Sequence, residues 1–314
     1  MKLATLKNGT PDGQLVVISA DGKRYAPAPI PTLQAAMEDW SQAEAQLRAV
    51  TTFPNELPVD QLAAPLPRAW QWLDGSAYES HGALMQIAFG SDPIETDRPL
   101  MYQGISDRFY GPHEDVAFPS EADGIDFEGE FGVIVDAVPM GISAQEALAH
   151  IRLIVQINDW SLRAIAPIEM KTGFGWVQAK PPCSVAPFAV TPEELGDDWR
   201  DGRVCLDLAV DWNGKRFGKA NGAPMAFGFH ELVAHAARTR SLVAGTIIGS
   251  GTVSNANFRE VGSSCISERR GSEIVDEGAA KTPFMSFGDS VRMEARSAAG
   301  DVLFGVIDQK VVSA

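Results

Sequence analysis

Residues 125–135 read IDFEGEFGVIV, and this stretch decides the fold. Side chains of a β-strand alternate between the two faces of a sheet, so a strand here places Asp126, Glu128 and Glu130 on one face. Neighbouring carboxylates on that face lie roughly 7 Å apart, and burying them without a cation is costly. The pattern therefore indicates either a solvated strand face or a site for a hard divalent cation, because Mg, Mn and Ca prefer oxygen ligands.

Further strands are predicted on both sides of this stretch. Runs rich in Val, Ile and Phe occupy 131–135, 153–157, 206–212, 246–248, 291–295 and 302–307. Asn213-Gly214 and Ala299-Gly300 are typical of hairpin turns. Only two long helical patterns intervene, at 143–151, where Ser143 and Glu146 form a capping box, and at 229–240. The chain is therefore predicted to be mixed α+β and mostly β.

The first 70 residues have a different pattern from the rest. A strand is expected over 14–19, with a turn after it and a return strand at 24–25. A helix over 32–50 begins with Thr32 as its cap, and the proline-rich stretch 53–67 resembles a linker. We expect a small N-terminal β-rich domain with its linker over 1–70 and a larger domain over 71–314.

Composition excludes several functional classes. The 314 residues carry a net charge of −15, so nucleic acid is not expected as a partner. No apolar run is long enough to span a membrane, and the N-terminus does not resemble a signal peptide. The three cysteines form no CxxC pair, which favours a reducing, cytoplasmic location.

Several motifs follow the Glu-x-Glu pair in a fixed order. Residues 157–163 read INDWSLR and end an apolar strand with Asp159; Lys180 stands just before two prolines; residues 249–254 read GSGTVS; and a Phe-Gly-Asp turn occupies 287–289. Together these motifs resemble the fumarylacetoacetate hydrolase family from about Asp74 to the C-terminus. The stretch LMYQG at 100–104 resembles its bacterial, fumarylacetoacetase-like members.

The resemblance implies a fold, an assembly and a cofactor. The family has a mixed β-roll catalytic domain, is usually dimeric and binds Mg, Mn or Ca, so we expect a homodimer with one of these divalent ions. By motif position, Glu128, Glu130 and Asp159 match the metal-ligating carboxylates, and Asp107 resembles the fourth.

The resemblance also implies catalytic and substrate-binding residues. His113 resembles the histidine that activates water, and Glu268 its carboxylate partner. Lys180 and Arg163 match the cations that hold substrate oxygens, and Tyr110 and Thr252 are further expected substrate contacts. The other four histidines, including His81, are expected to be structural or at the surface. Ala166 stands where the fumarylacetoacetase branch has a glutamine, which argues against fumarylacetoacetate itself as the substrate.

The expected reaction is hydrolysis of a carbon–carbon bond in a small anionic 1,3-dicarbonyl compound, such as an acylpyruvate. His113 would deprotonate water and Lys180 would stabilise the oxyanion, while the metal acts as a Lewis acid. A decarboxylase, hydratase or isomerase of 2-oxo or 2-hydroxydienoic acids would need only the metal site. A non-catalytic protein that retains the fold would have a purely structural carboxylate cluster.

Overall fold

A large sheet runs through the whole molecule. The computed structural model describes residues 1–90, 96–297 and 299–314. Within these ranges the large sheet has 11 strands, with β12 (Ser184–Val185) paired to β10 outside the main order. The main order is β4 (Asn55–Glu56), β3 (Arg24–Pro27), β2 (Gln14–Ile18), β1 (Lys2–Leu6), β13 (Ala189–Val190), β10 (Ile151–Asn158), β9 (Gly129–Val135), β18 (Thr246–Gly249), β5 (Trp72–Ser76) and β6 (Leu100–Gly104).

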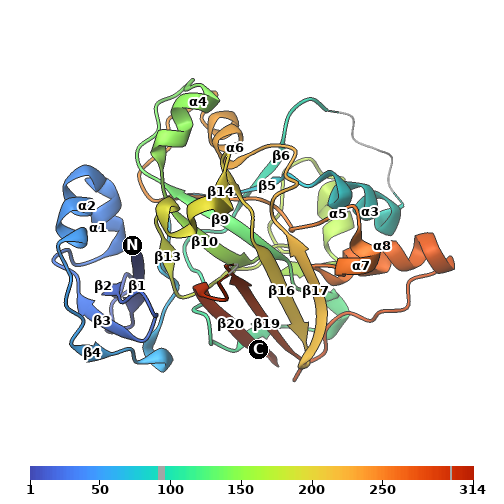
Figure 1. Ribbon diagram of the computed structural model, residues 1–314. Helices are drawn as coiled ribbons and strands as arrows, with labels where there is room; N and C mark the ends of the chain where they lie inside the picture. Colours follow the sequence, from blue (N-terminus) through green and yellow to red (C-terminus); the bar gives the residue numbers. More distant parts are fainter. Residues whose placement is uncertain (91–95, 298) are drawn as a thin grey trace.

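A second sheet packs against β9 and β10 (Figure 1). Its order is β17 (Lys215–Asn221), β16 (Asp207–Trp212), β19 (Ser290–Arg296), β20 (Val302–Ser313) and β7 (Val116–Phe118). Phe131 of β9 contacts Phe304 of β20, with ring centroids 5.8 Å apart, in the core between the sheets. Two small two-stranded sheets are formed by β8 (Ile125–Asp126) with β11 (Ser161–Leu162) and by β14 (Trp199–Arg200) with β15 (Arg203–Val204). The prediction of a mixed, mostly β fold is confirmed.

Both hairpin predictions are confirmed. Asn213 (φ 50°) and Gly214 (φ 71°) form the turn between β16 and β17. Gly300 (φ 89°) lies in the connection between β19 and β20. These left-handed backbone conformations favour Asn and Gly.

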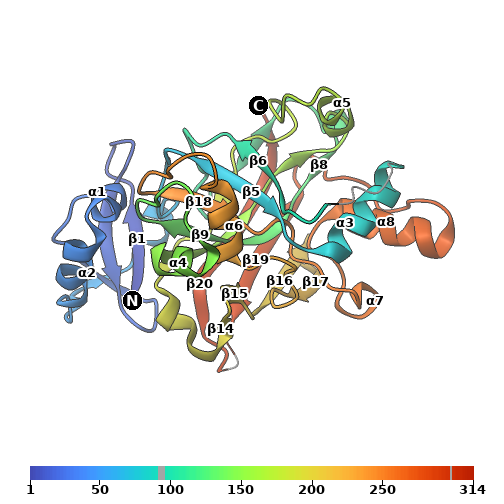
Figure 2. The same ribbon diagram turned by 90° about the horizontal axis from the view of Figure 1, so that it is seen from above.

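The N-terminal residues extend the large sheet, because β1 pairs antiparallel with β13 through Lys2 and Val190. Helices α1 (Leu33–Glu38) and α2 (Trp40–Arg48) lie beside this end of the sheet (Figure 2). Thr32 caps α1 as predicted, but the expected single helix breaks at Asp39. The proline-rich stretch is not a free linker: it contains β4 and buries Leu62 and Leu66 against the N-terminal strands and helices.

The sequence does not predict two of the longest helices. Helix α3 (Glu79–Phe89) follows β5 and packs against α8 (Ile266–Glu277).

The predicted capping box of Ser143 and Glu146 is confirmed at the start of α4 (Ala144–Ala147). This helix is shorter than the predicted range 143–151, because β10 begins at Ile151. The remaining helices are α5 (Ala166–Met170), α6 (Phe229–Ala236) and α7 (Phe258–Val261), with 3-10 turns η1 (Val59–Gln61), η2 (Glu121–Asp123), η3 (Leu148–His150) and η4 (Pro192–Asp198). Among the helices that the structure describes, none has the length and apolar character needed to cross a bilayer.

Candidate active site

The carboxylate stretch is not one continuous strand. β8 ends at Asp126 and β9 begins at Gly129, with Glu128 in an isolated bridge to Cys265. The carboxylate of Asp126 accepts hydrogen bonds from the backbone N–H groups of Ile266 (2.7 Å) and Ser267 (2.9 Å). Arg163 also donates to both Asp126 (2.8 Å) and Glu128, so these two carboxylates lie on the same side, but the Asp126 oxygens are occupied by Arg163 and the start of α8.

A buried carboxylate cluster combines side chains from β5, from β9 and from the residue that follows β10. One oxygen from each of Asp74, Glu130 and Asp159 lies within 4.8 Å of the other two. Burial, and then the neighbouring carboxylates, raise the pKa values of Asp74 and Glu130 well above their usual range. Both oxygens of Glu130 are buried without a hydrogen-bond partner among the described residues. Orphaned buried oxygens in an all-oxygen donor set fit a hard divalent cation.

The cluster differs from the predicted ligand set at two positions. The structure brings Glu130 and Asp159 together, but Asp74 of β5 joins them and not Asp107, and Glu128 is not a member of the cluster. Asp107 is exposed in the loop after β6 and lies outside the cluster. The sequence feature that was missed is Asp74, which follows Trp72 and Leu73 in β5 and is only 4% exposed.

Glu128 lies beside the cluster and is paired with two cations. Its carboxylate accepts from Arg163, from Lys180 Nζ (3.1 Å) and from Thr252 Oγ1 (2.7 Å). Burial alone would raise its pKa, but Arg163 and Lys180 outweigh burial and hold that pKa well below its usual range. Lys180 also donates to Asp159, and these two acids raise its pKa against the opposing effect of burial. Both cations are therefore charged and aimed at the carboxylates.

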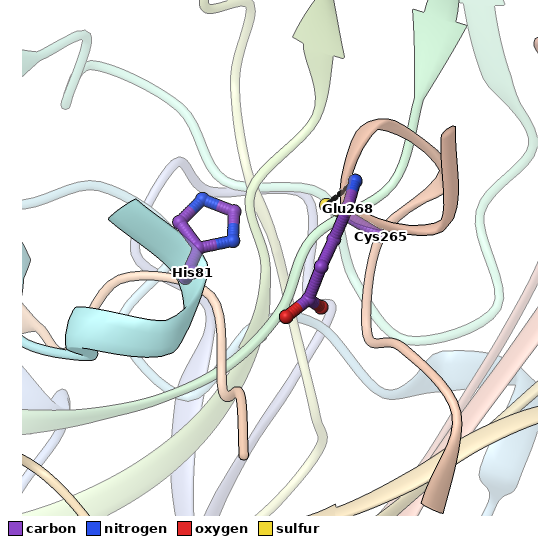
Figure 3. Close-up of side chains that lie close together, drawn as sticks. All are labelled: His81, Cys265 and Glu268. Atoms are coloured by element: carbon purple, nitrogen blue, oxygen red, sulfur yellow. Dashed lines mark hydrogen bonds between the residues drawn. The ribbon is translucent and has the colours of Figure 1, made fainter. Parts of the chain in front are cut away.

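A histidine and a glutamate face each other next to this cluster (Figure 3). His81 lies in the first turn of α3, and Glu268 lies in the first turn of α8, three residues after Cys265. Burial lowers the pKa of His81 to about 4 and raises the pKa of Glu268 to about 7. Ser254 donates a hydrogen bond to Glu268 and orients its carboxylate.

His113 does not take the predicted place beside Glu268. Its side chain is exposed in the loop before β7, and it is not among the residues that line the cavity described below. His81 lies there instead and lines the cavity described below, whereas the sequence analysis expected it to be structural or at the surface. The sequence analysis did not predict α3. Because this helix directly follows β5, Asp74 and His81 lie on either side of the short β5–α3 connection.

Several of these groups line one cavity of about 340 Å³. The polar and charged residues of its lining include Asp74, His81, Glu128, Arg163, Lys180 and Thr252. Its apolar residues are Met85, Leu100, Met101, Ala166, Met170 and Trp176. Tyr110 does not line it: its backbone pairs with Cys183, and Arg108 lies over its ring at 4.5 Å. The lining can hold an anion through its cations and an apolar group against its methionines and Trp176.

Two family models of related proteins match this chain, one over each of its two parts. The model described as fumarylacetoacetate (FAA) hydrolase C-terminal matches residues 71–312, and the model described as fumarylacetoacetase N-terminal domain 2 matches residues 1–68. A 2,4-didehydro-3-deoxy-L-rhamnonate hydrolase of Sphingomonas sp. (strain SKA58) is 29% identical over 57% of this chain and 59% of its own length. The chain thus spans less than two thirds of that relative. A mitochondrial oxaloacetate tautomerase of Bos taurus is 25% identical over 71% of this chain and 70% of its own.

Solved structures share the fold over the full chain length. Maleylpyruvate hydrolase from Sphingobium sp. SYK-6, in complex with manganese (II) ion and pyruvate, has a TM-score of 0.68 at 17% identity, with 100% of both chains covered. Fumarylacetoacetate hydrolase from psychrophilic Exiguobacterium antarcticum has a TM-score of 0.68 at 16% identity, again with 100% of both chains covered. At these identities the likeness concerns the fold alone.

Proposed function

The chain belongs to the fumarylacetoacetate hydrolase family, and on that basis we propose that it is a divalent-metal-dependent hydrolase that cleaves a carbon–carbon bond in a small anionic 1,3-dicarbonyl compound. The observation that carries the proposal is one shared cavity. Asp74, His81, Glu128 and Lys180 line it; Glu268 lies next to His81, and Glu130 and Asp159 lie next to Asp74. A base, an oxyanion donor and a metal site are the three groups that this hydrolysis requires.

Asp74, Glu130 and Asp159 would hold the metal ion, with Glu128 beside them. The orphaned oxygens of Glu130 support this assignment, as do the raised pKa values of Asp74 and Glu130, because a cation would compensate their repulsion. The manganese and pyruvate named with the maleylpyruvate hydrolase structure also support a divalent ion, Mg, Mn or Ca, beside a 2-oxo acid. When bound, the ion supplies Lewis-acid polarisation of a substrate carbonyl.

His81 would accept the proton of the attacking water. Its depressed pKa leaves the ring neutral near pH 7, so a nitrogen lone pair is available. Glu268 would stabilise the ring once it is protonated, as the carboxylate partner of a catalytic histidine does. Lys180 would hold the oxygen that becomes negative as the water oxygen attacks the carbonyl carbon. Arg163, fixed by Asp126 and Glu128, is placed for a substrate carboxylate or enolate oxygen.

The lining of the cavity narrows the substrate class. Among the described residues that line the cavity, the only Lys or Arg side chains are Arg163 and Lys180, and both are already paired with carboxylates. A second substrate carboxylate would find no further cation there and would lie against apolar side chains such as Met85, Met170 and Trp176, so its desolvation would be costly. We therefore propose a neutral, apolar acyl group as the leaving acid, as in an alkyl or aryl acylpyruvate.

A homodimer is part of the same proposal. Phe174 is 96% exposed and Val177 is 81% exposed in the loop that carries Trp176 to the cavity. Exposed apolar side chains of this size are typical of contact surfaces. Light scattering of purified protein at several concentrations tests the expected assembly of two chains.

Tautomerisation or decarboxylation of a 2-oxo acid is the nearest alternative, and the oxaloacetate tautomerase relative favours it. An assay with acylpyruvates and oxaloacetate in added Mg²⁺ or Mn²⁺ separates the reactions. Hydrolysis of an acylpyruvate yields pyruvate and one carboxylic acid in equal amounts, tautomerisation only interconverts the keto and enol forms, and decarboxylation of oxaloacetate releases CO2 together with pyruvate. A non-catalytic protein would turn over none of these compounds at any metal concentration.

A further inference from the structure

The geometry points to a second metal site: His81, Cys265 and Glu268 form a binding site for a borderline or soft divalent ion such as Zn²⁺, separate from the carboxylate cluster. One ligand atom from each residue lies within 4.8 Å of the other two. Figure 3 shows the imidazole of His81 on α3 facing the carboxylate of Glu268, with Cys265 at the start of α8.

The distances suit a zinc-type ion after a small closure. Zn–N bonds of about 2.0 Å and Zn–S bonds of about 2.3 Å place tetrahedral ligand atoms roughly 3.5 Å apart. The two helices that carry the ligands pack directly against each other, and Asp126 fixes the start of α8 through two backbone N–H groups. Side-chain rotation can therefore close the site without moving either helix.

The donor atoms are available. His81 Nδ1 is buried and has no hydrogen-bond partner among the described residues. The sulfur of Cys265 accepts one weak hydrogen bond, from the backbone N–H of Glu268 at 3.2 Å. The carboxylate of Glu268 is oriented by Ser254 and by the backbone N–H of Ser264 at 3.4 Å, which would serve as supporting contacts around the ion.

The donor set distinguishes this site from the first one. An imidazole nitrogen, a thiolate sulfur and one carboxylate oxygen select Zn²⁺ or Co²⁺, whereas oxygen-only sets select Mg²⁺, Mn²⁺ and Ca²⁺. On binding, the Cys265 thiol releases its proton to solvent and the sulfur forms the bond to the ion. Binding also takes the lone pair of His81, so Zn²⁺ should inhibit an enzyme that Mg²⁺ activates. That inhibition rests on the proposed function; the binding does not.

Cobalt spectroscopy tests the binding without any substrate. In full-length protein saturated with Mg²⁺, one equivalent of Co²⁺ should produce a thiolate-to-cobalt charge-transfer band. Cys265→Ser should abolish the band, because serine keeps an oxygen for capping α8 but supplies no thiolate. Cys183→Ser is the matched control, since Cys183 contacts Asp159 of the carboxylate cluster at 3.0 Å. A band that disappears in Cys183→Ser, or no band in the wild type, overturns the proposal.

Equilibrium dialysis provides the second measurement. In a Glu130→Gln background, which lacks a ligand of the oxygen-only site, Zn²⁺ should still bind at one equivalent per chain. Adding His81→Gln should raise its dissociation constant by at least about tenfold, the lower end for disturbing a metal site. His81→Gln leaves α8 unaltered, so it still tests zinc binding at this site if Cys265→Ser fails to fold. Unchanged Zn²⁺ affinity in the His81→Gln background contradicts the site.

Discussion

The imidazole of His81 faces the carboxylate of Glu268 across the contact between α3 and α8. Burial acts on these two groups in opposite directions: it lowers the pKa of the histidine to about 4 and raises that of the glutamic acid to about 7. Both shifts favour the uncharged form. A protonated imidazole would gain most from an ionised Glu268, so the pair is suited to receive a proton during a reaction.

Loss of this base should stop the reaction without disturbing the metal site. We predict that His81→Ala lowers kcat for acylpyruvate hydrolysis by at least about a hundredfold, a typical general-base contribution. Metal occupancy, measured by elemental analysis, should be unchanged. His113→Ala is the matched control, because His113 is exposed outside the cavity and should retain wild-type kcat. If His113→Ala lowers kcat and His81→Ala does not, the general base lies in the His113 loop.

The metal site can be tested through stability as well as activity. Burial and the neighbouring acids raise the pKa of Glu130, so near neutral pH its carboxyl costs stability that a glutamine does not, and Glu130→Gln should raise the Tm of metal-free protein. The same variant should lose the stabilisation that the ion gives the wild type, about 2.7 kcal/mol at a hundred times its Kd. Calorimetry with and without Mn²⁺ measures both effects.

Glu79→Gln is the control for Glu130→Gln, because Glu79 is exposed at the start of α3. It should respond to Mn²⁺ as the wild type does. A Mn²⁺-dependent rise of Tm that survives in Glu130→Gln would remove Glu130 from the ligand set.

The raised pKa of Glu268 predicts how stability changes with pH. Between its unfolded value near 4.5 and its folded value of about 7, the folded state binds more protons than the unfolded state. The contribution of Glu268 therefore falls as pH rises through that window, by up to about 1.4 kcal/mol per pH unit. His81 acts in the opposite direction between about 4 and 6.5, because its folded pKa is lowered.

Comparison with Glu268→Gln isolates the contribution of Glu268. Subtracting the unfolding free energies of the two proteins cancels the His81 contribution, which both share. In metal-free protein, urea unfolding should show the wild type losing stability relative to Glu268→Gln between pH 5 and pH 7. A difference that stays constant over this range would mean that Glu268 titrates normally.

The apolar side chains in the cavity lining should decide substrate preference. We predict that wild-type kcat/KM is higher for alkyl or aryl acylpyruvates than for analogues with a second carboxylate. Met170→Arg should raise kcat/KM for the dicarboxylate by about tenfold, since a charge-assisted hydrogen bond contributes roughly 1.5–3 kcal/mol. Ile168→Arg adds the same charge to α5 at a position that does not line the cavity, and it should leave the preference unaltered.

The sequence by itself determined the strands, the hairpins and part of the site. Alternation and turn residues act over a few neighbouring positions, so β9, β16–β17 and β19–β20 could be recognised locally. The motifs around Glu130, Asp159 and Lys180 could also be recognised, because their spacing is short.

Only the tertiary structure decided which acid and which histidine join them. Asp107 and His113 lie closer along the chain to the Glu-x-Glu pair, yet the pairing of β5 with β18 brings Asp74 to the cluster. The packing of α3 on α8 likewise brings His81 to Glu268. Neither contact has a local signature, because strand pairing and helix packing are set by burial of apolar faces contributed by distant segments.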